Sequence, residues 1–224
     1  MKFVLNSFNK EGKARIAGIV ADLMGDGHLQ NPPKNRFDYT SKHVGELDRF
    51  GKEIYKLFKV KGKIRRCTTN KYLTYNYGVN NKELAIFLDS VGVPRGNKVL
   101  KKFEVPRWII SDKIYFVKFI NRLFSCEASV DVKNKAIDFQ MYKSIELLKD
   151  GFYFFNQIKE NLEKYCKIRT TNVFLSGRHN IRKDGIATQC IRFKIKNLAS
   201  LKKYNQFIGF EDKIKQEKLD NILN

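Results

Sequence analysis

The feature that most constrains the fold is an internal repeat, in which two helical segments each end in a carboxylate. The first segment, residues 14–30, reads ARIAGIVADLMGDGHLQ, and its apolar residues recur at the three- and four-residue spacing of a helix buried on one side. Ala17, Ala21 and Gly25 lie four residues apart, so they form a stripe against which a second helix can pack closely. Asp26 follows directly, between two glycines that end the helix.

The second segment, residues 116–130, reads FVKFINRLFSCEASV, and its helical apolar spacing again leads to an acid. This acid, Glu127, lies 101 positions after Asp26. After each segment the pattern predicts a strand, a helix, two strands and a helix, at 36–42, 44–60, 61–79 and 81–91 and again at 135–140, 144–165, 167–196 and 197–207. We therefore predict an α+β protein of two similar halves, residues 1–100 and 116–224, joined by a linker at 101–115.

The charge of the chain restricts its partners. Lys and Arg number 44 against 23 Asp and Glu, and a net charge of +21 favours a polyanion such as nucleic acid. No apolar run approaches the roughly 20 residues of a membrane span, and the N-terminus lacks a signal-peptide pattern. We therefore expect an intracellular protein, in cytoplasm, nucleoid or organelle matrix, that is not secreted and has no membrane partner. The four cysteines form no CxxC pair, which argues against a zinc knuckle.

The segment IAGIVADLMGDG and the second acid-bearing helix resemble the paired signature of the LAGLIDADG homing endonucleases, in their single-chain, two-motif, intron-encoded type. The resemblance covers nearly the whole chain and includes GVPRGNK (92–98), VPRWI (105–109) and FIGFEDKIKQEKL (207–219). It implies two αββαββα-type halves, whose signature helices pair at the centre and whose β-sheets form a saddle for DNA. Arg122 and Ala128 depart from the family pattern, because glycine is usual at both positions.

The same resemblance implies a monomeric, site-specific endonuclease. It would hydrolyse one phosphodiester in each strand of a long asymmetric DNA site and leave short 3′ overhangs. Such hydrolysis needs a nucleophilic water, a stabilised leaving oxygen and a neutralised phosphate, which Mg²⁺ held by one or two carboxylates supplies. Mn²⁺ is expected to substitute, and Ca²⁺ to bind without turnover. The expected site residues are Asp26, Glu127, Gly25 and Cys126 as metal ligands, with Lys42, Gln140 and Lys143 as further catalytic groups.

Basic and aromatic side chains on the predicted strands are expected to contact the bases of the DNA, and the loop between the last two strands its backbone. These residues are Arg36, Arg65, Lys71, Tyr75, Tyr77, Arg169, Arg178, Arg182, Lys183, Arg192, Lys194 and Lys196.

Two other functions remain open with the same fold. One is an RNA-binding maturase whose partner is its own intron RNA, and the other is a DNA-binding regulator derived from a decayed nuclease. The two retained acids argue against the regulator, because buried negative charges are costly and weaken phosphate binding. An intein is less well supported, since Met1 is no nucleophile and no histidine precedes Asn224.

Overall fold

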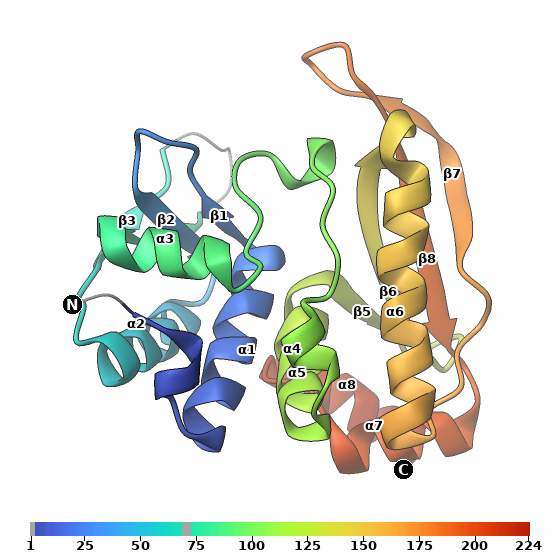
Figure 1. Cartoon of the computed structure of the whole chain (residues 1–224). Coiled ribbons are helices and arrows are strands. Elements are labelled where there is room, and N and C mark those ends of the chain that lie inside the picture. Colours follow the sequence, from blue (N-terminus) through green and yellow to red (C-terminus); the bar gives the residue numbers. More distant parts are fainter. Residues whose placement is uncertain (1–2, 69–72) are drawn as a thin grey trace.

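The computed structural model describes residues 3–68 and 73–224, which form two halves of one topology side by side (Figure 1). The first half consists of α1 (Lys10–Met24), β1 (Gly27–Leu29), β2 (Arg36–Ser41), α2 (Val44–Phe58), β3 (Lys63–Arg66), β4 (Tyr75–Asn80) and α3 (Lys82–Ser90). The second half repeats this order with α5 (Lys113–Glu127), β5 (Ala128–Asp131), β6 (Ala136–Ser144), α6 (Leu148–Cys166), β7 (Phe174–Ile181), β8 (Ala187–Ile195) and α7 (Leu198–Phe207). The predicted α+β class and the implied αββαββα order are confirmed.

In the described residues, five further elements lie outside this repeat: η1 (Leu5–Ser7) before α1, η2 (Lys98–Leu100) and α4 (Arg107–Ile110) between the halves, η3 (Ile145–Leu147) before α6, and α8 (Lys213–Leu223) at the end. The strand pattern did not predict β1 and β5, because three or four residues are too few to show alternation. Within the described residues, no helix combines the length and the apolar character needed to cross a membrane.

Each half contains a four-stranded antiparallel sheet, ordered β1-β2-β4-β3 in the first and β5-β6-β8-β7 in the second. The registers correspond, because Gly27 lies opposite Tyr39 and Ala128 lies opposite Phe139. Residues 39 and 139 are therefore equivalent positions. Helices α2 and α6 pack on one face of their respective sheets, and the opposite face is left open.

The two halves meet where α1 packs against α5 at the centre of the molecule (Figure 1). A Cβ added at Gly25 would lie 2.5 Å from the Cβ of Cys126, so the C-terminal ends of the helices come together only because Gly25 has no side chain. A Cβ at Gly18 would lie 3.4 Å from the Cγ of Arg122, so this glycine leaves room for the arginine that replaces the usual small residue. Ala128 has a φ of −90°, and the chain therefore needs no glycine there.

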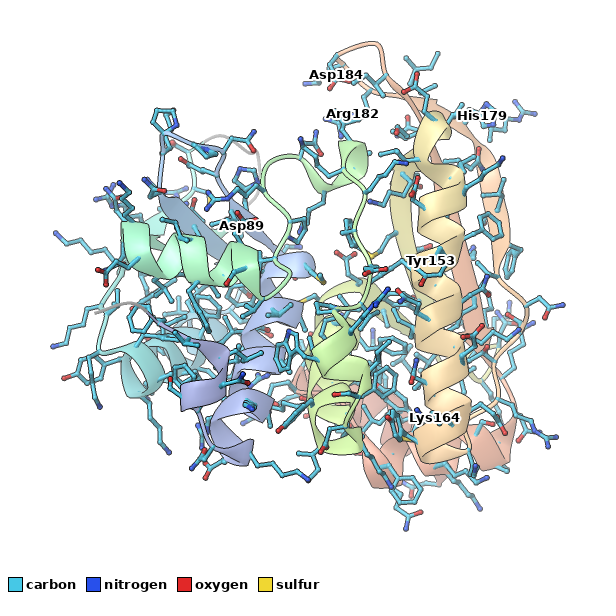
Figure 2. All side chains as sticks on the ribbon, viewed as in Figure 1. Asp89, Tyr153, Lys164, His179, Arg182 and Asp184 are labelled. Atoms are coloured by element: carbon cyan, nitrogen blue, oxygen red, sulfur yellow. The ribbon has the colours of Figure 1, made fainter. Side chains whose placement is uncertain are left out.

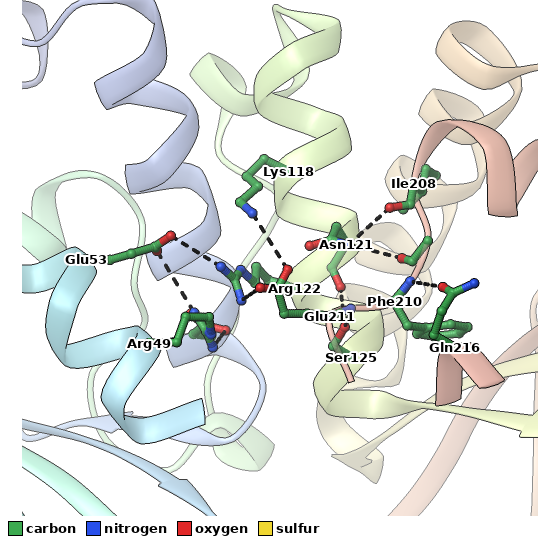
Figure 3. A network of polar contacts seen from close by, with 12 residues as sticks. Arg49, Glu53, Lys118, Asn121, Arg122, Ser125, Ile208, Phe210, Glu211 and Gln216 are labelled. Atoms are coloured by element: carbon green, nitrogen blue, oxygen red, sulfur yellow. Dashed lines mark hydrogen bonds and ion pairs between the residues drawn. The ribbon is translucent and has the colours of Figure 1, made fainter. Parts of the chain in front are cut away.

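Arg122 is the centre of a buried ion network at this helix crossing (Figure 3). Its Nη2 lies 3.2 Å from Glu53 Oε1 and its Nη1 lies 3.0 Å from Glu211 Oε1, while the residue is only 1% exposed. Glu53 also lies 4.0 Å from Arg49, which binds Asp22 of α1 at 2.8 Å. The network joins α1, α2, α5 and the segment before α8, so it links the two halves.

Candidate active site

The paired helices bring the two acids of the repeat into one site. Asp26 follows the C-cap of α1, and Glu127 is the last residue of α5. Burial, and next the negative charge of Asp26, raise the pKa of Glu127 to about 7. The two carboxylates therefore interact although 101 positions separate them in the chain.

A cleft of about 330 Å³ opens beside these helix ends. Most of the catalytic and ligand residues that the sequence suggested line it together: Gly25, Cys126, Glu127, Gln140 and Lys143, with Lys98 between them. Asp26 and Lys42 are exposed and do not line this cleft. Gln140 projects from the open face of β6, where the thiol of Cys190 lies 3.6 Å from its side-chain oxygen.

Two lysines that the sequence analysis did not single out flank the acids. Lys98 Nζ donates to the carbonyl of Gly25, and Lys215 Nζ donates to the carbonyls of Ser125 and, at 3.3 Å, Cys126. Each lysine thus covers the end of one central helix, directly before the acid. Their positive charges partly offset the rise in the pKa of Glu127.

The sequence does contain a signal for this lysine pair. Gly92 ends the helical region of the first half with a φ of 107°, and Gly209 ends that of the second with a φ of 64°. Lys98 follows the first glycine by six residues, and Lys215 follows the second by six. The repeat of the acids is therefore accompanied by a repeat of Gly-x5-Lys, within the same stretches 92–98 and 207–219 that carry the family resemblance.

Lys143 lies on the helix-covered side of its sheet and is 3% exposed. Its Nζ donates to the carbonyls of Lys98 at 2.7 Å and Lys101 at 2.6 Å, and lies 3.7 Å from the ring centroid of Phe103. Burial lowers the pKa of Lys143 to about 7. This geometry corrects the predicted catalytic role: Lys143 holds the segment that carries Lys98 in place.

The donor set at the helix ends suits a hard divalent cation. Its oxygens are two carboxylates and the neighbouring backbone carbonyls, and Mg²⁺ characteristically takes one or two carboxylates while keeping several waters. No group of three or more His, Cys, Asp or Glu side chains that could hold a metal occurs in the described residues. The carbonyls of Gly25 and Cys126 each accept a hydrogen bond from a lysine, Lys98 and Lys215 respectively, and each keeps a second lone pair, so their role as metal ligands stays a prediction.

The open faces of the sheets carry part of the predicted DNA-contacting set. Arg36, Arg192 and Lys194 project from these faces, and Arg65 lies opposite Asn76 on the same side of the first sheet. Arg169 and Lys196 are exposed next to β7 and β8. Arg178, Arg182 and Lys183 belong to the long β7–β8 hairpin, and Figure 2 shows Arg182 near its tip with His179 and Asp184.

The two tyrosines of this set lie on the other side of the sheet. Tyr75 and Tyr77 have the register of Ser41 and Tyr39, which turns both side chains toward the core. Tyr77 is 8% exposed, and its hydroxyl accepts a hydrogen bond from Gly62 N at 2.6 Å. The predicted DNA contact of Tyr77 is therefore wrong, and Tyr75 packs against the core. Lys71 lies outside the described residues.

Three curated proteins contain a segment similar to this chain. They are RNA polymerase subunit Rpo1N and the replication factor C small subunit of Methanocaldococcus jannaschii, and the tRNA-splicing ligase RtcB of Pyrococcus abyssi. Identities are 28%, 25% and 29% over 93%, 71% and 42% of this chain. The matched segments make up 16%, 9% and 11% of those proteins, so the chain spans about a sixth of their length or less. No family model matches the chain.

Among solved structures, the homing endonuclease I-DmoI is similar over 89% of this chain and 91% of its own, with a TM-score of 0.58 and 16% identity. Its complex with DNA and Mn gives a TM-score of 0.57 at 15% identity, over 88% and 97% of the two chains. DUF199/WhiA from Thermatoga maritima matches over 98% of this chain and 62% of its own, with a TM-score of 0.56 and 13% identity. At these identities the likeness concerns the fold alone.

Proposed function

This chain has the LAGLIDADG fold, and from that premise we propose that it is a Mg²⁺-dependent endonuclease that cuts both strands of a specific duplex DNA site. The observation that carries the proposal is the meeting of Asp26 and Glu127 at the ends of the paired helices, with a lysine beside each. A phosphate-binding surface alone has no use for two adjacent carboxylates in a chain of net charge +21.

The site residues divide the chemistry between them. Asp26 and Glu127 hold the metal, which when bound supplies an activated water, a stabilised leaving oxygen and a neutralised phosphate. Lys98 and Lys215 place positive charge beside the helix ends, where the scissile phosphates gain negative charge during hydrolysis. Gln140 is placed on the open side to orient the attacking water. Because the site has two-fold pseudosymmetry, each half serves one DNA strand, and the cut leaves short 3′ overhangs.

The curated relatives support the proposal that the DNA encoding this segment moves between genes. A polymerase subunit, a replication factor and an RNA ligase have different activities by name, yet each contains a stretch similar to this chain. DNA that inserts itself at new loci would give this distribution, and a site-specific double-strand cut starts such an insertion. Those stretches are parts of translated proteins. An insertion in frame with a protein-coding gene is therefore a second candidate, beside the predicted intron, for the element that encodes this segment.

The DNA-binding regulator and the maturase that the sequence left open are the competing functions. The pairing of Asp26 and Glu127 favours the nuclease over both, because two adjacent carboxylates attract a divalent cation but repel the phosphates of a nucleic acid.

The test uses duplex DNA made by joining the two flanks of the chain's own reading frame, with the locus that still contains the reading frame as control. We expect a discrete double-strand cut of the joined duplex in Mg²⁺ or Mn²⁺, binding without a cut in Ca²⁺, and no cut with chelator. Binding in Ca²⁺ with no cut in Mg²⁺ or Mn²⁺ would instead identify a regulator. Tight binding to structured intron RNA without duplex binding would identify a maturase.

A further inference from the structure

Two carboxylates on the open, basic faces of the sheets, one in each half, occupy corresponding positions. Asp38 is adjacent to position 39, and Asp138 is adjacent to the equivalent position 139. Asp38 lies opposite Gly78 on β4, and Asp138 lies opposite Lys194 on β8. An acid on a surface that faces DNA repels phosphate. Its presence in both halves therefore indicates that each acid binds a particular cationic side chain.

In the first sheet that partner is Arg36. Its Nε lies 2.9 Å and its Nη2 lies 2.5 Å from Asp38 Oδ1. Gly78 provides the space for this pair, because an added Cβ would lie 2.9 Å from Asp38 Oδ1 and 3.0 Å from Arg36 Nη2. The guanidinium therefore lies across β4 in a fixed orientation.

In the second sheet the partner is Arg192, which comes from the neighbouring strand. Its Nε donates to Asp138 Oδ1 at 3.0 Å, its Nη2 donates to Oδ2, and its Nη1 donates to Ser176 Oγ at 2.8 Å. Lys194 Nζ lies 3.1 Å from the same carboxylate. The Asp138 side chain is 5% exposed, whereas that of Arg192 is 22% exposed, so the arginine is held from behind and remains accessible.

In both pairs the carboxylate binds the Nε–Nη2 edge of the guanidinium, through one oxygen of Asp38 and through both oxygens of Asp138. One N–H of Arg192 Nη1 is donated to Ser176 Oγ, so each arginine keeps at least one N–H of Nη1 and one of Nη2 for a further acceptor. Two parallel N–H donors match the O6 and N7 acceptors of guanine in the major groove. A phosphate can also accept two parallel N–H donors, but the adjacent carboxylate repels an anion more strongly than it repels the uncharged edge of guanine. Resting on the proposed function, we infer that Arg36 and Arg192 each recognise one guanine, in opposite half-sites of the DNA target.

The positions of the arginines make the two guanines asymmetric about the cut. Arg192 lies opposite Gln140, which directly follows Phe139 in β6. Phe139 in turn pairs with Ala128, the residue after Glu127. Arg36 lies three residues from Tyr39, which pairs with the residue after Asp26. Arg192 is thus the nearer of the two to its acid, and the guanine of the second half-site lies closer to the cleavage position.

Selection from a randomised duplex library tests this inference without requiring cleavage. The protein is allowed to bind in Ca²⁺, and the selected sites are sequenced for the wild type, Arg36→Gln and Arg192→Gln. We expect two guanine preferences in the wild type, one of which disappears in each variant, with affinity for guanine-bearing sites reduced roughly 5- to 150-fold. Arg65→Gln is the matched control. Arg65 lies on the same face with no carboxylate partner in residues 3–68 and 73–224, so its loss should weaken all sites equally.

Two further measurements separate recognition from folding. Asp138→Asn retains the arginine but loses the charged partner, so it should relax the preference at one position while leaving binding to unselected duplex intact or stronger. Replacing that guanine by 7-deazaguanine removes only N7, and should weaken the wild type but not Arg192→Gln. Unchanged preferences in both arginine variants, or a uniform loss across all sites, would overturn the inference and leave the endonuclease standing. Failure of the wild type to enrich any duplex would overturn both.

Discussion

Glu127 shows at the scale of a single residue how the fold prepares a carboxylate for a cation. Its pKa rises from the ordinary value of 4.5 to about 7, chiefly through burial. Between these values the folded protein holds a proton that the unfolded chain has released. The stability that Glu127 contributes is therefore present below about pH 4.5 and is lost as the pH rises through about 7.

Glu127→Gln should raise the melting temperature of the metal-free protein at pH 8, because the neutral amide avoids the cost of ionising a buried acid. At pH 5 the two proteins should differ little, since the wild-type side chain is then protonated in the folded state. Thermal melts in chelator at both pH values measure this. Glu217→Gln, at an exposed position of α8, is the control and should change neither melt. Equal melting temperatures for Glu127→Gln and the wild type at pH 8 would contradict the raised pKa.

The residues of the site could be predicted from the sequence where they belong to the repeat. They could not be predicted where only the tertiary structure brings them to the site. Asp26 and Glu127 follow periodic helices, so their positions were evident. Lys98 and Lys215 reach the site from η2 and α8; both follow a glycine by six residues, but that spacing alone does not say where such segments fold back. Tyr77 was assigned to the wrong side of its sheet, because alternation gives two faces without saying which is buried.

At the scale of elements, the packing of α1 against α5 depends on the absence of a side chain at Gly25. Gly25→Ala places a Cβ 2.5 Å from the Cβ of Cys126, which forces the helix ends apart. We expect a loss of about 1–3 kcal/mol in the free energy of unfolding, as overpacked cores show, measured by denaturant titration. Gly45→Ala, in the first turn of α2 with nothing within 4 Å of its added Cβ, should be neutral or stabilising.

A second substitution tells whether the contact itself is responsible. Cys126→Gly removes the clashing Cβ, so the double variant with Gly25→Ala should regain part of the lost stability. If Gly25→Ala unfolds at the same denaturant concentration as the wild type, the helix ends do not approach as closely as described.

The long helices and strands could be predicted from the sequence, whereas the shortest strands could not. The long amphipathic helices α1, α2, α5 and α6 show a clear period in the sequence, and the hairpins show alternation. Strands β1 and β5 form by pairing with β2 and β6, and segments this short show no sequence pattern that predicts such pairing. The partners of Arg122 were also not predicted, because Glu53 and Glu211 are distant from it in the sequence and belong to other segments.

At the scale of the whole molecule, Arg122 links the two halves through Glu53 and Glu211. Arg122→Met removes the guanidinium and leaves Glu53, at 9% exposure, with Arg49 at 4.0 Å as its remaining cation, and Glu211 with Lys118 at 3.9 Å. We expect a loss of about 3 kcal/mol in the free energy of unfolding, at the low end of the usual cost of breaking a buried pair from one side, because each acid keeps a more distant partner.

The comparison with Lys118→Met controls for simple loss of charge. Lys118 Nζ lies 3.9 Å from Glu211 near the surface, so its removal should cost about 1 kcal/mol or less. Adding Glu53→Gln to Arg122→Met should restore part of the stability by removing one uncompensated charge. Equal costs for Arg122→Met and Lys118→Met would show that the network does not hold the halves together.

The whole molecule combines a basic open face on two sheets with a pair of acids where the halves meet. This arrangement accounts for a chain of net charge +21 that nevertheless retains two adjacent carboxylates. One chain contains both halves of the site, and the monomeric state stays a prediction.

The central claim is that Asp26 and Glu127 together form the metal centre of a DNA-cutting site. The most direct measurement compares the wild type, Asp26→Asn and Glu127→Gln on the joined-flank duplex, with cleavage followed in Mg²⁺ and binding followed in Ca²⁺. We predict that the wild type cuts both strands, whereas each variant binds the duplex and fails to make the double-strand cut. Cleavage by either variant at the wild-type rate would show that these carboxylates do not form the catalytic site.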